Sequence, residues 1–335
     1  MEEIKRSILT THELAIGYES KVIASDLNLV LNSNEMVCLL GQNGVGKSTL
    51  IRTIANLQPV LNGAVLINDN QIDRLNKFEL ASTIGIVTTE KIGALNLTVR
   101  ELVSLGRYPY TNWLGKLTKA DLDKVDDAIS LCKINYLEDQ KMANLSDGQK
   151  QKAMIARVLA QDTRIIILDE PTAHLDMINR AEVMKLLSDI KSTHNKAILI
   201  STHELPLSLQ FADRLWLMNY NQPIIEGIPE ELVLTGALND IFFHESFDID
   251  VATGKVVLQT DNRIMVGLQG ESDVLFWVKA ALERNLIGVI NEAEYNFTVK
   301  MKNHTMHWFC NGKESNASGM GIESMIKFIE SLNAA

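Results

Sequence analysis

Between residues 41 and 49 the chain reads Gly41-Gln42-Asn43-Gly44-Val45-Gly46-Lys47-Ser48-Thr49. An apolar run precedes it at 36–40, and apolar residues at helical spacing follow at 50, 51, 54 and 57, so we expect a buried strand, a tight loop and a helix. Glycines let such a loop curl so that backbone N–H groups point at phosphate oxygens, and the helix adds the positive end of its dipole. Lys47 would reach the β- and γ-phosphates, and the Ser48 hydroxyl would bind Mg²⁺. The alternative, a glycine-rich turn that precedes Lys-Ser by chance, does not account for the flanking strand and helix.

A second buried strand is predicted to supply carboxylates. Residues 164–168 form an apolar run that is followed by Asp169 and Glu170. Because ligands of parallel sheets bind at the carboxyl ends of the strands, both acids can face the phosphate loop. Asp169 would hold the Mg²⁺ shell, and Glu170 would be the general base that polarises the attacking water. Two solvated acids at a strand end are the alternative, which the phosphate loop disfavours.

The composition is that of an ordinary globular protein. Of 335 residues, 46% are hydrophobic and 22% are charged, so a largely disordered chain is excluded and about two domains are expected. The net charge of −10 disfavours a free-standing nucleic-acid binder, and no nucleic acid is expected as a partner. Three scattered cysteines fit a reducing compartment. The sequence shows neither a secretory signal nor an apolar run of about 18 residues, so the chain is not expected to span a membrane by itself.

The first part of the chain predicts an α/β fold, with strands at 84–87 and 196–201 and a helix at 178–191. Residues 98–141 instead predict a helical insertion. Thr98 with Glu101 makes a capping box, and Gly106 is the expected end of that helix. Thr118 is the expected cap of a second helix, whose predicted apolar stripe is Leu122, Val125, Ile129 and Cys132.

A break in the pattern near residues 236–262 predicts a domain boundary. Beyond it we expect a strand at 263–268, a helix at 273–284, strands at 295–302 and 306–310, and a helix at 322–332. This order suggests a small α+β domain. The predicted domains are therefore residues 1–240, with a helical subdomain at about 92–147, and residues 241–335. The second domain either stabilises the first one or its dimer, or senses a ligand.

Between the phosphate loop and the two acids stands Leu145-Ser146-Asp147-Gly148-Gln149. With this stretch the chain resembles the ATP-binding-cassette (ABC) ATPases, over roughly residues 8–235. Residues 41–49 match Walker A, 145–149 the signature motif and 165–170 Walker B. Ala173-His174-Leu175-Asp176 matches the D-loop, Tyr18 the aromatic residue that stacks on adenine, and His203 the switch histidine. The resemblance implies a P-loop NTPase fold and hydrolysis of ATP with Mg²⁺.

The resemblance also implies how the site works. Two cassettes form a homodimer and sandwich two ATP molecules, so that the signature of one subunit caps the γ-phosphate held by Walker A of the other. Ser146, Gly148 and Gln149 would serve this purpose at a helix start, where the dipole is positive. Asp176 of the D-loop belongs to the same nucleotide site. His203 would contact the γ-phosphate and hold Glu170 and water in place, although a histidine after an apolar strand could also be structural.

Two positions depart from the family pattern. The family usually has a glutamine after the strand at 84–87, which touches Mg²⁺ and the membrane partner, but here Thr89 and then Glu90 occupy that place. Either Thr89 contributes a hydroxyl ligand to the metal, or Glu90 reaches it. Asp147 stands where the family often has glycine, and a helix N-terminus tolerates an acid there.

Transport is the commonest task of the family. Gly106-Arg107-Tyr108-Pro109-Tyr110 is similar to the importer cassettes for ferric siderophores, haem and cobalamin. The resemblance implies a peripheral protein at the cytoplasmic face of the inner (plasma) membrane, with membrane-spanning permease subunits as partners and a substrate-binding protein as an indirect one. Apolar residues of the insertion would line the groove for a permease helix, or would pack its own small core: Leu95, Leu97, Tyr108, Tyr110 and Trp113.

Other classes fit less well. Soluble ABC proteins of translation carry two cassettes in one chain, and those of DNA repair insert a long coiled coil, which this sequence does not show. A GTPase would need Asn-Lys-x-Asp, whereas residues 76–79 read Asn-Lys-Phe-Glu. A small-molecule kinase would have no use for the signature motif. Ferric siderophore is the first expected cargo, with cobalamin or haem as alternatives.

Overall fold

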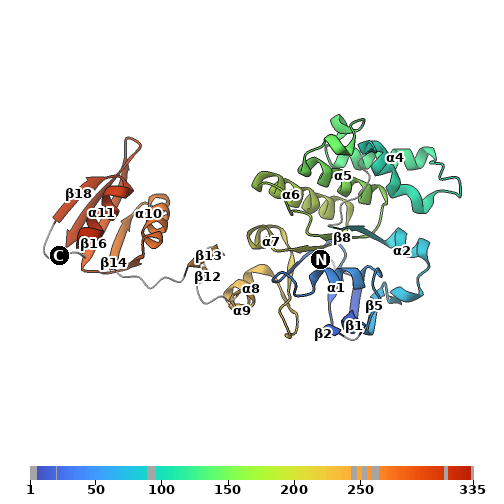
Figure 1. Ribbon diagram of the computed structural model, residues 1–335, viewed down its shortest axis with the longest axis horizontal. Helices are drawn as coiled ribbons and strands as arrows, with labels where there is room; N and C mark the ends of the chain where they lie inside the picture. The colour runs from blue at the N-terminus through green and yellow to red at the C-terminus, as the bar shows by residue number, and fades with distance from the viewer. Residues whose placement is uncertain are drawn as a thin grey trace, which may run out of the picture. The chain divides into compact units, whose positions relative to one another are not determined.

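The computed structural model describes residues 6–19, 21–88, 96–242, 247–250, 255–258, 264–312 and 316–332. These residues form two compact units (Figure 1). The first, termed the N-terminal unit, lies within Met1–Phe243 and Ile249–Val256. The second, termed the C-terminal unit, lies within His244–Asp248 and Val257–Ala335. Within the described part of the chain, no helix is long and apolar enough to cross a bilayer.

A six-stranded sheet forms the centre of the N-terminal unit, in the order β11-β10-β4-β9-β8-β7. Its strands are parallel except β11, which pairs antiparallel with β10. Every residue of β4, β8 and β9 is buried, as expected for parallel strands covered on both faces. The strands are β4 (Met36–Leu40), β7 (Ile84–Val87), β8 (Ile165–Asp169), β9 (Ala197–Thr202), β10 (Arg214–Leu217) and β11 (Ile225–Gly227).

A second, antiparallel sheet in this unit has the order β2-β1-β5-β6, with β3 paired to β1. Helix α1 (Lys47–Ile54) buries Leu50, Ile51 and Ile54 in one core with side chains from both sheets. This packing fixes the helix directly behind the loop at 41–46. The strands are β1 (Ser7–Tyr18), β2 (Lys21–Leu27), β3 (Val30–Asn32), β5 (Asn62–Ile67) and β6 (Asn70–Gln71).

The predicted helical insertion is present, and its α4 lies with α5 on the side of the unit opposite β1, β2 and β5 (Figure 1). Both α3 and α4 pack against α5. The helices are α2 (Lys77–Thr83), α3 (Val99–Ser104), α4 (Lys119–Leu131), α5 (Asp147–Ala160), α6 (Met177–His194), α7 (Leu205–Phe211), α8 (Pro229–Leu234) and α9 (Ala237–Phe242). Short 3₁₀ turns occur at Ile72–Arg74, Leu105–Tyr110, Asn135–Leu137 and Met142–Asn144.

Two details of the insertion were predicted wrongly. Gly106 does not end the first helix, because the chain continues from α3 into the 3₁₀ turn Leu105–Tyr110. This glycine is needed for close packing instead, since a Cβ there would lie 2.1 Å from the Arg157 carbonyl oxygen of α5. Leu122 is exposed, whereas Val125, Ile129 and Cys132 are buried as expected. The capping boxes of Thr98 and Thr118 are confirmed.

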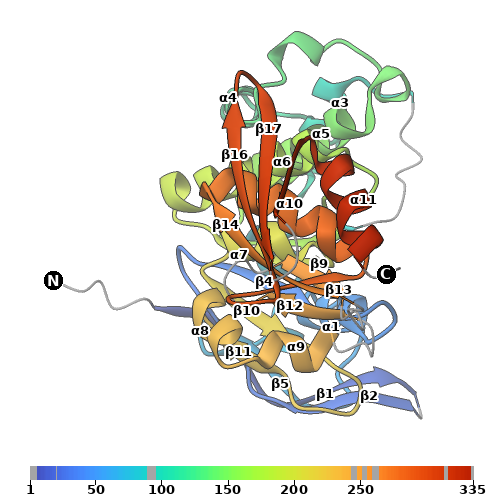
Figure 2. The same cartoon turned by 90° about the vertical axis from the view of Figure 1, so that its left-hand side faces the viewer.

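The C-terminal unit is built on a five-stranded sheet in the order β15-β14-β16-β17-β18. β14 pairs parallel with β15 and β16, and the β16–β17 hairpin is the longest feature of the sheet (Figure 2). The elements are β14 (Ile264–Gly270), α10 (Ser272–Arg284), β15 (Ile287–Ile290), β16 (Tyr295–Lys302), β17 (Thr305–Gly312), β18 (Asn316–Met320) and α11 (Ile322–Leu332). The predicted α+β class is confirmed, although β15 and β18 had not been expected.

Helices α10 and α11 share one apolar core with this sheet, centred on Phe297, Trp308 and Met325. A separate two-stranded sheet, β12 (Phe247–Asp250) and β13 (Lys255–Leu258), falls in the stretch predicted as a break.

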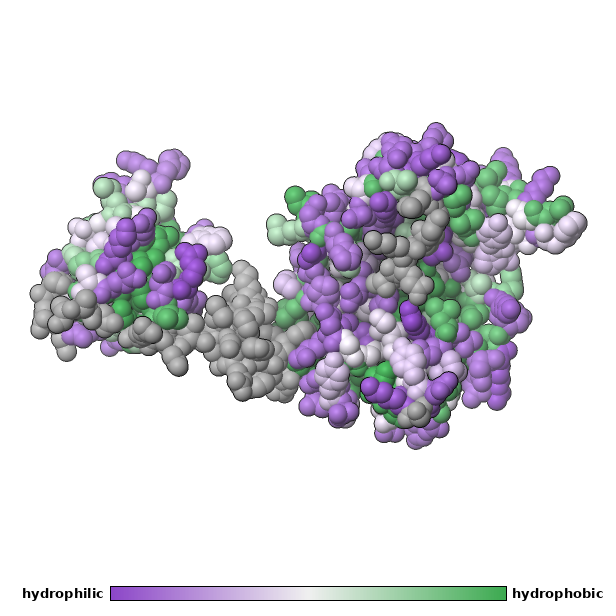
Figure 3. Space-filling view, in the orientation of Figure 1, coloured by the Kyte–Doolittle hydropathy of each residue, from purple (hydrophilic) through white to green (hydrophobic). Residues whose placement is uncertain are grey.

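Hydrophilic side chains predominate on the visible face of the N-terminal unit (Figure 3).

Candidate functional site

The loop at 41–46 joins β4 to α1 in a conformation that only glycine adopts easily. Gly44 has φ of +82° and Gly46 has φ of +119°. A Cβ on Gly46 would also lie 2.5 Å from Cγ2 of Ile23. Gly46 is the N-cap of α1 and offers no side chain to its first turn, so the N–H groups there are free to bind an anion.

Lys47 is the buried cation of this loop. Its side chain is only 5% exposed, and its Nζ donates to the carbonyl oxygens of Gly41, at 2.8 Å, and Gln42, at 3.0 Å. Burial lowers the pKa of the Lys47 ammonium below its usual value, while the carboxylates of Glu170 and Asp169 act in the opposite direction. A phosphate beside Lys47 would add a directly paired anion to the two carboxylates that already act on this desolvated ammonium.

Asp169 and Glu170 lie at the carboxyl end of β8, as predicted. Asp169 is buried, accepts from the Ser48 hydroxyl at 3.2 Å, and accepts also from the Ser201 hydroxyl. Glu170 has φ of +48°, and its backbone N–H donates to Ser201, with 3.0 Å to the carbonyl oxygen and 3.1 Å to Oγ. The end of β9 thus fixes the turn that carries both acids.

His203 follows β9 and faces the acid of the neighbouring strand. Its Nδ1 lies 3.8 Å from Oε2 of Glu170, and its Nε2 lies 3.8 Å from Oε1 of Glu204. Glu204 in turn accepts from the guanidinium of Arg180. The structure therefore brings together Lys47, Ser48, Asp169, Glu170 and His203 around one loop, which parallel neighbours β4, β9 and β8 hold in place.

Two tyrosines border the loop. Tyr18, at the end of β1, has its Oη 3.3 Å from Oγ1 of Thr49, and its ring is 53% exposed and able to stack on a base. Tyr220 was missed by the sequence analysis. Its hydroxyl donates to the Asn43 carbonyl oxygen at 2.9 Å and so supports the loop. No local sequence signal marks it, because it reaches Asn43 through the pairing of β10 with β4, in which Leu217 lies beside Leu40.

The signature stretch forms the start of α5. Ser146 is the N-cap and accepts from the Gln149 backbone N–H at 3.3 Å, and the Gln149 side chain accepts from the Ser146 N–H at 3.0 Å. A Cβ on Gly148 would lie 2.7 Å from the Asn179 side chain. The described hydrogen bonds of Ser146 and Gln149 stay within the first turns of α5, so they do not join the loop at 41–46 of the same chain.

Asp176, predicted to belong to the nucleotide site, caps the next helix. It is the N-cap of α6 and accepts from the Asn179 backbone N–H at 2.8 Å. This bond and the one from the Asn179 side chain hold the pKa of the Asp176 carboxyl below its usual value. Thr89, predicted as a metal ligand, and Glu90 lie outside the described residues.

The insertion presents a cluster of exposed apolar residues. Trp113 is 90% exposed, and Tyr108 and Leu114 are exposed as well. Tyr110 behaves differently, because its ring lies under the guanidinium of Arg107 and edge-on to Phe78. Some members of the predicted apolar set are thus exposed and available to a permease helix, whereas Tyr110 packs within the protein. Leu95, another member of the set, lies outside the described residues.

Known proteins with similar sequences bind ATP, as the geometry of this site suggests. Residues 24–173 match a family model described as ABC transporter, and residues 263–330 match a second one, the Iron ABC transporter C-terminal domain. The chain is 35% identical over 234 residues to the achromobactin transport ATP-binding protein CbrD of Dickeya dadantii (strain 3937), which covers 70% of this chain and 87% of that protein. It is also 35% identical over 234 residues to the petrobactin import ATP-binding protein FpuD of Bacillus anthracis, with 70% and 86% covered.

A solved structure gives the same fold. The protein cbiO1 of Clostridium perfringens, part of the ABC transporter complex cbiONQ, superposes with a TM-score of 0.62 at 29% identity, over 71% of this chain and 96% of that one. The fold and the site define an ATP-binding cassette. The chain belongs to the ATP-binding proteins of ABC transporters, and it is an ATPase. Its C-terminal unit carries the domain of the iron transporters within that family.

Proposed function

We propose that this chain is the ATP-hydrolysing subunit of an importer that takes up an iron–siderophore chelate through a partner permease. One observation carries the proposal: an ABC cassette whose relatives are named for siderophore transport stands in one chain with an iron ABC transporter domain. Cobalamin or haem import and a soluble, non-transport ATPase are the alternatives. The exposed tryptophan and tyrosine of the insertion favour transport, because such a cluster suits docking to a permease.

In this proposal the loop at 41–49 holds the phosphates of ATP and Tyr18 stacks on the adenine. Lys47 leaves its two carbonyl partners and pairs with the β- and γ-phosphates. The donor set fits Mg²⁺, because the oxygens of Ser48 and Asp169 are hard ligands only 3.2 Å apart. When bound, Mg²⁺ neutralises charge on the β- and γ-phosphates. Thr89 remains a predicted further ligand.

Glu170 is the proposed general base. Its carboxylate accepts the proton of the water that attacks the γ-phosphate. His203, 3.8 Å away, orients that carboxylate and contacts the γ-phosphate. The strained φ of Glu170 fits a residue whose position is set by function, because the surrounding strands pay for the strain.

The signature residues complete the site from a second copy of the chain. Ser146, Gly148 and Gln149 stand at the positive end of α5, which suits a γ-phosphate. Their own hydrogen bonds stay within α5, which is consistent with an ATP-induced homodimer. Asp176, at the start of α6, would lie at the same junction. The dimer would work peripherally, at the cytoplasmic face of the plasma membrane, under two permease subunits, and a substrate-binding protein would deliver the chelate.

The test is a tagged pull-down from detergent-solubilised membranes and, in parallel, from cytosol, with mass spectrometry of what co-elutes. We expect a polytopic permease from the membrane sample, and its loss when Trp113 and Tyr108 are both changed to Ser. A Trp277→Ser variant is the matched control, because Trp277 is exposed as well but lies on α10 of the C-terminal unit, outside the insertion. Recovery from cytosol alone, with ribosomes or soluble enzymes, would contradict the proposed role in import. The assignment as an ATPase would not be affected by that result.

A further inference from the structure

A second polar pocket lies at the opposite end of the central sheet from the ATP site. Its volume is about 640 Å³, within the range of small-molecule sites. Arg164 directly precedes β8 and Lys196 directly precedes β9, so the pocket borders the amino ends of these strands. Asp169, Glu170 and His203 follow their carboxyl ends, and the pocket is therefore separate from the nucleotide site.

The lining of this pocket is basic in an otherwise acidic chain. Arg6, Arg164 and Lys196 are permanent cations, and His194 adds an imidazole. No lining residue is an acid, although the whole chain has a net charge of −10. Such local inversion of charge concentrates small anions.

The cations differ in what they already bind. Lys196 donates to the Thr163 carbonyl oxygen at 2.7 Å and to Asp162 at 3.2 Å, so its charge is compensated. Within the described residues, Arg6 and Arg164 have neither a side-chain hydrogen bond nor an ion pair. By contrast, Arg100 and Arg107 of the same unit are both paired with carboxylates.

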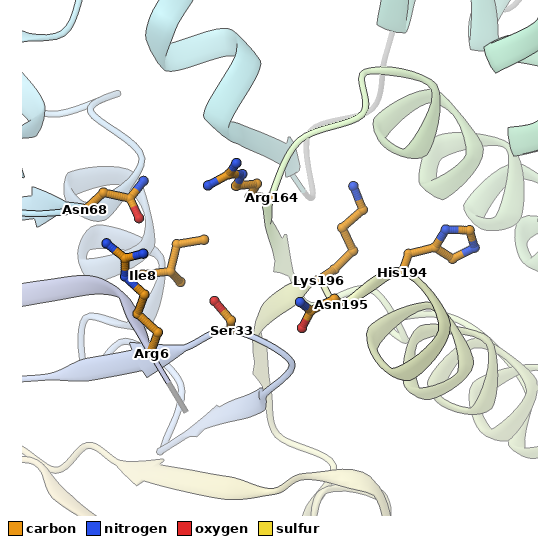
Figure 4. Close-up of a pocket in the computed structure, with 8 residues that line it drawn as sticks. All are labelled: Arg6, Ile8, Ser33, Asn68, Arg164, His194, Asn195 and Lys196. Atoms are coloured by element: carbon orange, nitrogen blue, oxygen red, sulfur yellow. The ribbon is translucent and has the colours of Figure 1, made fainter. Parts of the chain in front are cut away.

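The two free guanidinium groups face the same side of the pocket. Figure 4 shows the Arg164 side chain directed to the side where Arg6 and Asn68 lie, whereas the His194 ring lies at the opposite side. The Asn68 amide, a neutral hydrogen-bonding group, lies on the same side as Arg6. Guanidinium forks bind phosphate and carboxylate oxygens in pairs, which a single ammonium does not do.

We propose that this pocket binds a small oxyanion with at least two negative charges, held by Arg6 and Arg164. Both arginines are exposed and no lining acid occupies their donors, so an oxyanion that enters the pocket can pair with them. The modest volume selects a compact phosphate- or carboxylate-bearing molecule over an extended acidic peptide. Because β8 and β9 run from this pocket to the catalytic residues, the bound anion would stabilise the strands that carry them.

Isothermal titration calorimetry with citrate and with pyrophosphate, without nucleotide or Mg²⁺, tests the proposal. The wild-type chain should bind one citrate and two pyrophosphates, the second of these in the loop at 41–49. Arg6→Gln with Arg164→Gln should weaken citrate binding at least about tenfold and remove one pyrophosphate. Lys47→Ala should remove the other pyrophosphate and leave citrate unchanged. Binding of pyrophosphate but not citrate would assign the site to phosphates.

Arg74→Gln with Arg284→Gln is the matched control, since it removes the same charge from exposed positions outside the pocket. An independent measurement on the wild-type chain is hydrogen exchange, in which citrate should slow the amides around Ser33 and Asn68. The proposal is overturned if all anion binding depends on Lys47, or if the two-arginine variant binds citrate as tightly as the control. Tighter binding of a glutamate decapeptide than of citrate would overturn the small-ligand assignment.

Discussion

The two units use their buried interiors for different purposes. In the N-terminal unit, polar groups are buried where parallel strands end, and Asp169 shares hydrogen bonds with two serine hydroxyls there. In the C-terminal unit, the interior is aromatic, with the Trp308 ring 5.9 Å from Phe297 and 5.2 Å from Phe328 between ring centroids. Within the described residues, no group of three metal-binding side chains occurs in either unit.

The difference shows where function costs stability. Glu170 has a positive φ directly after a fully buried strand, and the buried ammonium of Lys47 donates to two carbonyl oxygens. Such strain and desolvation persist because the sheet around them is well packed. The C-terminal core follows ordinary packing rules, so changes there should act on stability, whereas changes at the loop should act on turnover.

The largest expected effect is that of Glu170→Gln in the N-terminal unit. Loss of the general base should reduce ATP turnover by about 10²–10⁴-fold. ATP binding should persist, so size-exclusion chromatography should reveal an ATP-dependent dimer. Phosphate release measures turnover, and Glu182→Gln, at an exposed ion pair with Lys152, is the control. Normal turnover in the Glu170 variant would remove the base assignment.

Lys47→Ala should reduce turnover by about 10²–10³-fold, because it removes the charge that meets the developing phosphate anion. Unlike the Glu170 variant, it should also weaken ATP binding, which fluorescence titration with a labelled nucleotide measures. Thermal unfolding of the C-terminal unit should be unchanged, since its core contains no residue of the loop. Unaltered nucleotide affinity would show that the buried ammonium is structural.

Trp308→Ala tests whether a change in the C-terminal core acts on stability. The ring is 4% exposed, and its Nε1 donates to the Ser324 hydroxyl at 2.8 Å, so the free energy of unfolding of the C-terminal unit should fall by about 3–5 kcal/mol. Calorimetry of the whole chain measures this as a shift of one transition. Trp277→Ala, at a ring that is 68% exposed, should have a much smaller effect.

ATP turnover should be retained in the Trp308 variant. The two units have separate cores, so loss of packing in one does not remove contacts within the other. A large drop in turnover at a temperature where the N-terminal unit stays folded would contradict the separation of turnover from the C-terminal core. It would show that the C-terminal unit takes part in the ATPase cycle.

The sequence predicts most of the fold where periodicity and chemistry agree. β4, the loop and α1 form one unbroken signal, and the capping boxes locate α3 and α4. The ends of elements were harder, because Gly106 could be taken for a helix stop until its packing against Arg157 was visible. β15 and β18 were missed, since each is only four or five residues long and β18 contains Ala, Ser and Gly.

The candidate site also contains residues that the sequence predicts and residues that it does not. Its motif residues could be predicted because phosphate and metal chemistry require those residue types at that spacing. Tyr220 could not, because it reaches Asn43 only through the pairing of strands far apart in the sequence. The basic pocket escaped for the same reason, as Arg6, Arg164 and Lys196 come from three separate segments.

The smallest expected effect concerns Ser146, which has two roles to separate. As the N-cap of α5 it should contribute about 1 kcal/mol to the free energy of unfolding of the N-terminal unit, so Ser146→Ala should lower this value modestly. Thr118→Ala is the matched control, because Thr118 caps α4 with the same kind of capping box. Urea unfolding should give similar losses for both variants.

Turnover distinguishes the two roles. If Ser146 also caps the γ-phosphate of a second copy, Ser146→Ala should lose ATPase activity and ATP-dependent dimerisation beyond anything seen for Thr118→Ala. Equal retention of turnover in both variants would reduce Ser146 to a helix cap. In that case Ser146 would affect stability alone, as the C-terminal core residues do. The functional contrast between the two units would then depend only on the loop at 41–49 and on Asp169 and Glu170.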